Sequence, residues 1–473
     1  MEFRHGIGAI AGGTPGEDIR SCEVHSCAGP SCSGKFRPGK FRPGKFRPGA
    51  PLSRLFHICL LVSALLLPAA AAALEQPAGE ARQEAVRAVA IDISGNREKS
   101  RIMLTLSAPV EARTFLLERP DRLIIDLPQV AFSLSADSHA GARKGVAGGL
   151  VASYRYGLFA QGRSRVVVDL KEPALVSKVT SEPVANGAML TVELSRTDRA
   201  AYGRAAMQPM VEAAAALSAA ENARAAAARA SAQAADRQDS RPLVMIDPGH
   251  GGVDPGAIRK GIQEKDLVLS FARRLQEKLG AGGRYRVQLT RGDDSFISLA
   301  GRVRIAREAG ADLFISVHAD SLGGNGSVRG ATVYTSSNTP TDEESAQLAA
   351  KENLADQIAG LEAAEETGDV VGILAELTRR ETQALSHVFA ERTIETLRAQ
   401  VHLNRNPHRS AGFRVLKAPD VPSVLLELGY LSSEQDVALL TSDAWQEKTV
   451  RALVAAIDRF FARRIAEQGR DKG

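Results

Sequence analysis

Short apolar runs that end in turn or polar residues characterise the second half of the chain. Residues 243–246, 311–317 and 424–426 have the length and composition of buried strands. A run with helical spacing lies between the first two, at 267–279. Strands that alternate with helices predict an α/β domain over 241–466, with a mostly parallel twisted sheet flanked by helices.

A different pattern, of short segments that alternate apolar and polar residues, runs from about 86 to 194. Turn residues separate the segments, so we predict a separate all-β sandwich domain over 85–196. Two of the segments share the order Arg, three apolar residues, Asp and Leu, which suggests two similar halves. No nucleophile, metal cluster or phosphate loop is apparent in them, so we expect a binding domain, with a passive spacer as the alternative. The clearest segments are 101–106, 122–127, 165–170 and 188–194, of which the second and third carry the shared order.

Residues 197–240, between the two predicted domains, are rich in alanine with scattered Arg, Glu, Gln and Ser. Alanine favours helix, but no sustained apolar stripe is present that would dock such a helix on a domain. We therefore predict an Ala-rich, partly helical linker.

The N-terminal part has the composition of a leader. Residues 1–50 contain three tandem Gly-Lys-Phe-Arg-Pro units at 34–48 and little apolar material, which cannot build a core. We interpret them as a disordered basic leader or a mis-assigned start, and a tail for acidic surfaces is the alternative. Residues 51–73 combine Arg54, a short apolar core and an Ala-rich end, which predicts a signal peptide of the general secretory route. We expect no stable membrane insertion after cleavage, and a retained anchor is the alternative.

Cysteine content and charge both change at the predicted cleavage point. All four cysteines lie before residue 73, so the mature chain would have none. Residues 1–73 hold nine of the 60 Lys and Arg residues and four of the 55 Asp and Glu residues, which accounts for the whole formal charge of +5. The rest of the chain is neutral in formal charge, so bulk charge gives no reason to expect nucleic-acid binding.

Ligand-type side chains follow the predicted strands of the α/β domain. His250 comes after the first strand in a Gly-rich turn, His318 directly follows the second, and Glu427 directly follows the third. Glu264 precedes the helical run. Active sites of open α/β sheets lie at the carboxyl ends of strands, and two His with one Glu form a ligand set of zinc hydrolases. A lone strand-end His is usually structural, but three such strand ends predict a zinc hydrolase of an amide or ester, with Glu427 as proton carrier.

Four motifs of this domain resemble a known family. IDPGHGGVDPGA, then Glu264, then FISVHAD and PSVLLELGYLSS occur in the order found in the zinc-dependent N-acetylmuramoyl-L-alanine amidases. The resemblance implies that His250, Glu264 and His318 bind one zinc ion and that Glu427 is the catalytic acid/base. It also implies hydrolysis of the amide between N-acetylmuramic acid and L-alanine in peptidoglycan.

The predicted sandwich is similar to the AMIN domain that often precedes such amidases. That similarity implies peptidoglycan binding and recruitment to the division site, and so a periplasmic enzyme that splits the septal wall. Two alternatives stay open: a zinc exopeptidase that acts on peptides alone, and a non-catalytic wall-binding scaffold. The scaffold would normally lack a metal ligand or the catalytic glutamate, whereas all four residues are present here.

An insertion with helical pattern interrupts the α/β domain. Its residues 341–380 place apolar side chains on two faces, while 382–399 fits an ordinary crossover helix. Similarity to division-type amidases implies that an inserted helix covers the zinc, and that its glutamate blocks the metal until an activator related to lysostaphin-like metallopeptidases removes it. Glu352 is the candidate for this glutamate, and Ile373 and Leu374 mark the candidate partner surface. Helices that merely pack on the domain are the alternative.

Overall fold

The described part of the protein begins at residue 86. In the computed structural model it comprises residues 86–134, 143–144, 148–160, 162–206, 211–236, 239–321, 328–361 and 373–470. The predicted leader, 1–50, and the predicted signal peptide, 51–73, lie outside these residues. None of the helices in the described ranges is both long and apolar enough to cross a membrane.

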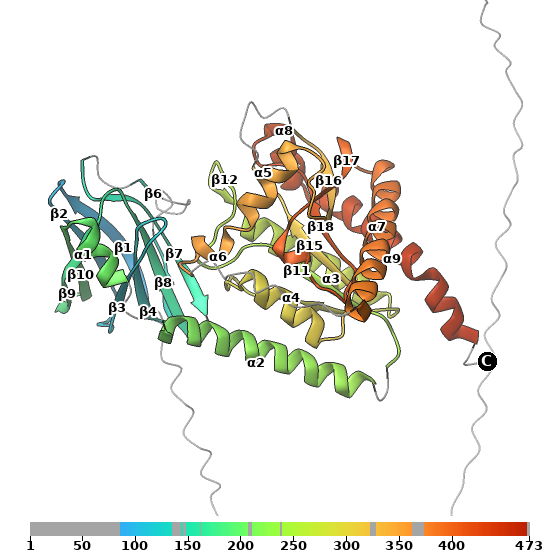
Figure 1. Ribbon diagram of the computed structural model, residues 1–473, viewed down its shortest axis with the longest axis horizontal. Helices are drawn as coiled ribbons and strands as arrows, with labels where there is room; N and C mark the ends of the chain where they lie inside the picture. The colour runs from blue at the N-terminus through green and yellow to red at the C-terminus, as the bar shows by residue number, and fades with distance from the viewer. Residues whose placement is uncertain are drawn as a thin grey trace, which may run out of the picture. The chain divides into compact units, whose positions relative to one another are not determined.

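The first described region is a β-sandwich of two five-stranded sheets (Figure 1). One sheet has the order β5-β1-β2-β10-β9 and the other the order β3-β4-β8-β7-β6. Neighbouring strands are antiparallel, except for β1 and β5, which are parallel. The predicted all-β architecture of this region is confirmed. The strands are β1 Val86–Gly95, β2 Lys99–Leu106, β3 Arg113–Leu117, β4 Arg122–Pro128, β5 Val130–Phe132, β6 Arg143–Lys144, β7 Val151–Ala160, β8 Arg163–Leu170, β9 Ala174–Val184 and β10 Gly187–Arg196.

Alternation along the strands builds the sandwich core. In β2, Ile102, Leu104 and Leu106 are fully buried, and the residues between them are more exposed. Each fully buried aliphatic side chain of this kind contributes roughly 1.5–3 kcal/mol. Strands β4 and β8 depart from the alternation, because consecutive residues on both of their faces are buried. Something other than the sandwich core must therefore cover their second face.

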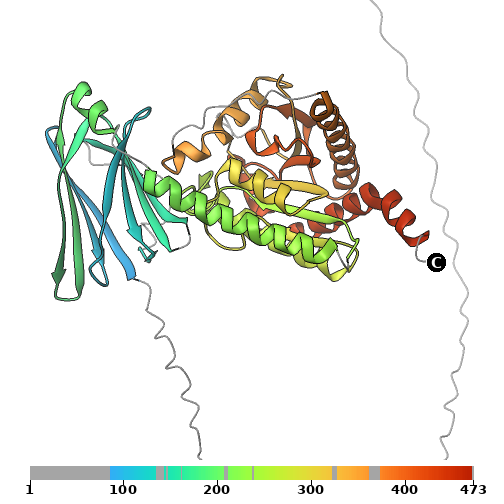
Figure 2. The same ribbon diagram turned by 60° about the horizontal axis from the view of Figure 1, so that its bottom comes forward.

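The Ala-rich segment after the sandwich forms α1, Arg199–Ala206, and α2, Val211–Asp236. We expected no apolar stripe that could dock this segment, but α2 packs along α4, Leu299–Glu308, as Figure 2 shows. Ala225 of α2 is buried in the core beside the main sheet, and Glu221 accepts a hydrogen bond from an amide at the start of α4 at 2.8 Å. Small side chains allow close helix packing that a hydropathy pattern does not reveal, and an anion at a helix N-terminus is stabilising.

The second described region is built on a six-stranded sheet with the order β14-β11-β15-β18-β16-β17. Neighbouring strands are parallel, except that β16 and β18 are antiparallel. The predicted mostly parallel sheet is therefore confirmed. Its strands are β11 Leu243–Pro248, β14 Arg286–Leu289, β15 Leu313–His318, β16 Ala331–Ser336, β17 Leu403–Ala411 and β18 Ser423–Glu427, and a hairpin of β12 Ile258–Arg259 and β13 Ile262–Gln263 lies outside it.

Helices cover both faces of this sheet (Figure 1). Val244 and Ile246 of β11 pack into one core with residues of α3, α7 and α9, whereas Leu243 and Met245 pack into the other with residues of α2 and α4. All four are fully buried, which is why the strand reads as a continuous apolar run. The remaining elements are α3 Glu264–Ala281, α7 Ile373–Arg398, η2 Arg414–Leu416, α8 Glu434–Leu440 and α9 Asp443–Arg470.

The insertion contributes α5, Glu343–Glu352, and α6, Ala355–Ile358. Helix α7 crosses the expected boundary near residue 380, since it is one continuous helix that includes both 373–380 and most of 382–399. No Gly or Pro interrupts α7, so nothing in its sequence ends the helix there.

Candidate metal centre and active site

Three strand ends meet at one edge of the main sheet. Strands β11, β15 and β18 are adjacent and parallel, and His318 at the end of β15 pairs with Glu427 at the end of β18. His250 follows two residues after the end of β11. Glu264, the first residue of α3, reaches the same edge. The four residues predicted from strand ends and from the helix start are therefore brought together.

The loop after β11 requires glycine at two positions because other side chains lie so close. A Cβ atom at Gly249 would lie 2.4 Å from the His318 ring, and one at Gly256 would lie 2.7 Å from a carboxylate oxygen of Glu264. His250 itself has a φ of +56°, in the left-handed region that non-glycine residues adopt only at a cost. The loop thus holds this histidine in a strained conformation within a crowded site.

A buried ion pair stabilises the loop that carries His250. Arg302 donates to Asp247 at 2.8 Å, to the carbonyl oxygen of Pro248 at 2.7 Å and to that of His250 at 2.7 Å. Burial alone would raise the pKa of Asp247, but Arg302 and two hydroxyl groups hold it below its usual value. Breaking such a buried pair typically costs about 3–5 kcal/mol. The pair therefore fixes the backbone that carries the histidine.

Four side-chain atoms converge above this edge. Nε2 of His250 lies 3.2 Å from Oε1 of Glu264 and 3.6 Å from Oε2 of Glu352. Nδ1 of His318 lies 3.2 Å from each of the same two oxygens. Ligands at about 2.0–2.1 Å from a tetrahedral zinc ion are about 3.3–3.4 Å from one another. The four His–Glu separations therefore fit a shared ion of this kind, and His250, His318 and Glu352 form a group whose ligand atoms all lie within 4.8 Å of one another.

Unpartnered buried atoms also indicate a cation. Nε2 of His250, Oε1 of Glu352 and Oε1 of Glu427 have no hydrogen-bond partner among the described residues. Nε2 of His250 is near a carboxylate, but the geometry suits a shared central ion better than a direct hydrogen bond. On the other side of the ring, Nδ1 is bonded to Asp254 at 2.8 Å, which orients the ring toward the site. A metal ion would satisfy atoms that are otherwise costly to bury.

Glu264 is held as an anion. Its carboxylate accepts hydrogen bonds from the backbone amides of Ala257 at 2.8 Å and Ala319 at 2.9 Å. Burial opposes ionisation, but His250 and His318 hold the pKa of Glu264 well below its usual range. A carboxylate that stays charged and is fixed by two amides is suited to bind a cation permanently.

Glu427 has the opposite electrostatic environment. Its side chain is fully buried and accepts one hydrogen bond, from the backbone amide of Asp320 at 3.0 Å. Burial raises the pKa of Glu427 well above its usual range, and the negative charges of Glu264 and Asp320 raise it further. A carboxyl group with a raised pKa is suited to take up and release a proton.

Glu352 enters the site from the inserted helix α5. It is the last residue of that helix, and Lys351 beside it forms an ion pair with Asp320. Asn353 donates to and accepts from the backbone at 412–414, in two bonds of 2.9 Å. The cavity that remains beside the histidines measures only about 10 Å³, at the lower limit for one water molecule. The insertion therefore fills the space in front of the candidate metal ligands.

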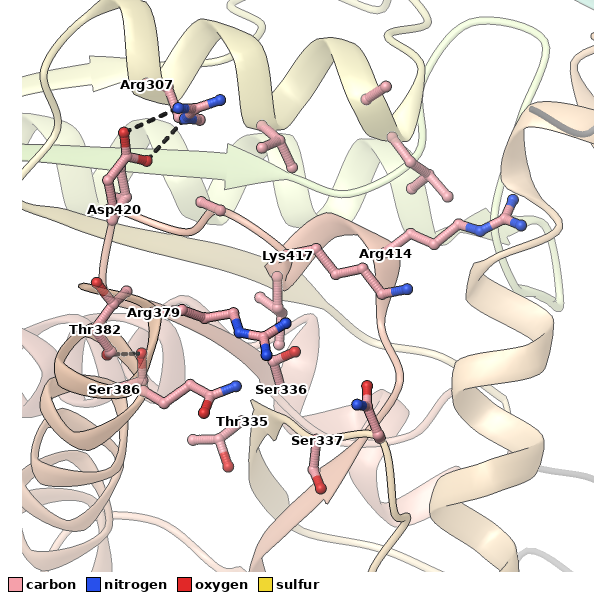
Figure 3. A pocket seen from close by; sticks show the side chains of 18 of the residues that line it. Arg307, Thr335, Ser336, Ser337, Arg379, Thr382, Ser386, Arg414, Lys417 and Asp420 are labelled. Atoms are coloured by element: carbon pink, nitrogen blue, oxygen red, sulfur yellow. Dashed lines mark hydrogen bonds and ion pairs between the residues drawn. The ribbon is translucent and has the colours of Figure 1, made fainter. Parts of the chain in front are cut away.

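A much larger cavity, of about 1320 Å³, lies between α4, α7 and the η2 segment. Figure 3 shows Arg307 paired with Asp420 there, at 2.8 Å, and the charged ends of Arg379 and Lys417 directed toward the interior. None of the candidate metal ligands lines this cavity, so the volume of a cavity does not by itself locate the candidate active site. Asp356 of α6 also lines it and accepts a hydrogen bond at 3.0 Å from the first amide of α4. This hydrogen bond holds α6 of the insertion against α4.

The predicted partner surface is only partly described. Ile373 and Leu374 begin α7, but the placement of their side chains lies outside the described residues. Leu377, one turn further on, is 55% exposed, and Leu385 and Val388 of the same helix are also exposed. Leu385 follows Leu377 by eight positions and Val388 follows Leu385 by three, so the three exposed side chains lie on one side of the helix.

Two residues of the site were missed from the sequence. Asp254 orients His250, and the Asp-Pro-Gly turn that contains it was a usable signal. Lys351 was not recognisable, because its partner Asp320 lies 31 residues away on another element.

Comparisons with known proteins give matches for both described domains. The model of the N-acetylmuramoyl-L-alanine amidase family matches residues 244–459, and the model of the AMIN domain matches residues 90–194. The chain is 31% identical over 384 residues to the N-acetylmuramoyl-L-alanine amidase AmiC of Neisseria meningitidis, covering 78% of this chain and 89% of the relative. It is 34% identical over 229 residues to AmiA of Escherichia coli, covering 48% and 78%. The solved amidase AmiC2 of Nostoc punctiforme aligns with 47% of this chain and 97% of its own, at 27% identity and a TM-score of 0.34.

Proposed function

Because the chain belongs to the N-acetylmuramoyl-L-alanine amidase family and is such an amidase, we propose that His250, Glu264 and His318 hold a zinc ion and that Glu427 transfers the proton. The bond cleaved joins N-acetylmuramic acid to L-alanine of the stem peptide. The observation that carries this assignment is the convergence of buried His and Glu atoms at 3.2–3.6 Å, with Glu427 on the adjacent strand. Family membership favours this reading over an exopeptidase or a non-catalytic scaffold.

A bound zinc ion would polarise the scissile carbonyl and lower the pKa of a water molecule. Glu427 accepts the proton of the attacking water and then donates it to the leaving amine of L-alanine. Its raised pKa suits both steps, since the same group must hold the proton between them. Asp254, bonded to Nδ1 of His250, leaves Nε2 of that ring as the nitrogen that would bind the ion, and the two backbone amides keep the Glu264 carboxylate in place.

Replacing His250 by alanine is expected to lower the zinc content from about one ion per chain to less than about 0.1, because three protein ligands are needed for a stable site. Elemental analysis after gel filtration measures this ratio without relying on activity. His408→Ala is the matched control, since His408 is bonded to Glu391 on α7. Full zinc stoichiometry in the His250→Ala protein would place the metal elsewhere.

We further propose that α5 is an autoinhibitory element. Its Glu352 supplies a carboxylate as a fourth ligand, in place of the water that the reaction needs, and the remaining cavity of about 10 Å³ leaves no room for substrate. Burial raises the pKa of Glu352 to about 7, and the two histidines oppose that rise. A cation bound between these groups would favour the charged form and so strengthen the inhibitory contact.

The cellular role we propose is periplasmic cleavage of septal peptidoglycan, with the AMIN domain binding the wall. Release of α5 would come from an activator related to lysostaphin-like metallopeptidases. The exposed apolar residues Leu377, Leu385 and Val388 support a docking surface on α7, next to the predicted Ile373 and Leu374.

A Leu377→Glu variant tests this surface, because a charge at the centre of an apolar contact is expected to weaken activator binding about ten-fold or more. Titration of the activator against stem-peptide release gives the apparent affinity. Val184→Glu, on an exposed strand of the sandwich, is the control. An unchanged affinity for Leu377→Glu would exclude α7 as the docking surface.

A further inference from the structure

The two segments with the order Arg, three apolar residues, Asp and Leu form a charged face on the sandwich. Strands β4 and β8 pair antiparallel, so that Arg122 lies opposite Asp169 and Asp126 lies opposite Arg165. Residues between them, such as Leu123, belong to the sandwich core. Because side chains alternate along a strand, the four charged residues lie on the face turned away from that core. Such a face is normally wet, but Arg122 is 2% and Arg165 0% exposed.

Segment 355–361 of the insertion covers this face. Three arginines donate hydrogen bonds to four consecutive carbonyl oxygens at the end of α6. Carbonyls at and just beyond a helix C-terminus generally lack intrahelical partners, and cations near them are stabilising. Here the carbonyl of Gln357 also accepts a hydrogen bond from the backbone amide of Gly360 at 2.9 Å. The bonds run from Arg122 to Gln357, from Arg155 of β7 to Ile358 at 2.8 Å, and from Arg165 to Ala359 at 2.9 Å and Gly360 at 3.2 Å.

Acidic partners hold two of these arginines, Arg155 and Arg165, in position for these bonds. Asp126 binds Arg165 through two nitrogen atoms, at 2.6 and 2.9 Å, and Asp169 binds Arg155 at 2.7 Å. The guanidinium carbon of Arg165 lies 3.4 Å from the centre of the Phe159 ring. Bidentate pairs and ring contacts fix the direction of the remaining donors. The repeated sequence pattern therefore supplies two of the three arginines of a donor site that binds backbone carbonyls.

The contact is close as well as polar. Gly360 has a φ of +77°, and a Cβ atom there would lie 2.6 Å from Ile124 of β4. Ala359 and Phe159 share a buried apolar cluster with Val253, which belongs to the same loop as the metal-ligand histidine. The sandwich thus contacts both the insertion and the loop of the metal site.

Segment 355–361 is joined directly to the blocking residue. Only Asn353 and Leu354 separate Glu352 from α6, so α5 cannot leave the site freely while α6 is held. We propose that Arg122, Arg155 and Arg165 clamp segment 355–361 and thereby keep Glu352 in the closed position. This rests on the proposed inhibition by Glu352. The sandwich then contributes to the inhibition by Glu352 in addition to its proposed wall-binding role.

Two variants of the full-length zinc-loaded protein test the clamp. Arg122→Gln with Arg155→Gln removes two donors, and Asp126→Leu with Arg165→Met replaces the buried pair by apolar side chains of similar size, which generally preserves a fold. Arg101→Gln is the control, because Arg101 pairs with Glu193 on the other sheet. The measurements are stem-peptide release from sacculi and hydrogen–deuterium exchange of the amides in 343–361. Both clamp variants are expected to raise basal release about ten-fold and to speed exchange in this segment. The reason is that loss of one charge-assisted hydrogen bond costs a free energy that corresponds to about a ten-fold change in an equilibrium constant.

Each variant is also combined with Glu352→Ala, which separates the effect of the arginine clamp from the inhibition by Glu352, called the lock below. Clamp changes that add no further release in the Glu352→Ala protein support the proposal. If Glu352→Ala raises release but both clamp variants leave release or exchange at the level of the parent, the clamp is wrong and the lock stands. If Glu352→Ala leaves release unchanged, the lock itself fails, and the clamp as a part of it is overturned.

Discussion

Replacement of Glu427 by glutamine is expected to lower stem-peptide release by about 10²–10⁴-fold while zinc content and thermal stability stay unchanged. Glutamine keeps the size of the side chain and can still accept the hydrogen bond from the Asp320 amide, but it cannot carry a proton. The effect is best measured in the Glu352→Ala background, where the basal rate is high enough to show a large loss. Mass spectrometry of the released fragments gives the rate, and elemental analysis gives the zinc ratio.

Glu434→Gln is the matched control for this experiment, because Glu434 is exposed at the start of α8 and pairs with Lys260. Its activity should equal that of the parent. Full activity of the Glu427→Gln enzyme would show that another group carries the proton. Loss of zinc together with loss of activity would instead assign Glu427 to the metal.

Replacement of Glu352 by alanine is expected to raise release in the absence of an activator. If the closed form outnumbers the open form by about 99 to 1, removal of the blocking carboxylate raises the basal rate up to about 100-fold. The products should be free stem peptides, which mass analysis distinguishes from the fragments of a peptidase acting within the stem. Addition of an activator should then give little further increase.

Glu343→Ala provides the control within the same helix, because Glu343 is exposed at the start of α5. This change should leave the basal rate as it is. Equal release from the parent and the Glu352→Ala protein would remove Glu352 from the inhibitory role and leave the amidase reaction unaffected. Loss of zinc from Glu352→Ala would mean that this carboxylate is a required ligand and not a removable one.

Much of the fold and most of the site follow from local sequence patterns. The apolar runs around Val244 and Phe314 predicted buried parallel strands, and parallel strands align their carboxyl ends, so His250, His318 and Glu427 were expected to meet. The alternation around Ile102 likewise predicted a sandwich, since side chains alternate between the two faces of a strand. These conclusions need only the periodicity of the backbone and the order of the strands.

The tertiary structure decided the rest, because it depends on which surfaces meet. Alanine content predicted that α2 is helical, but only packing shows that Ala225 is buried and that Glu221 reaches the start of α4. The position of Glu352 in the insertion suggested a blocking role, but its distance of 3.2 Å from His318 is set by contacts of α5 and α6 with other elements. The sequence by itself determined the main buried strands, the alternating segments of the sandwich and the ligand-type residues at the strand ends. The bonds from Arg165 to Ala359 and Gly360, across more than 190 residues, follow from the folded arrangement alone, since periodicity shows that a face is apolar or charged but not what will cover it.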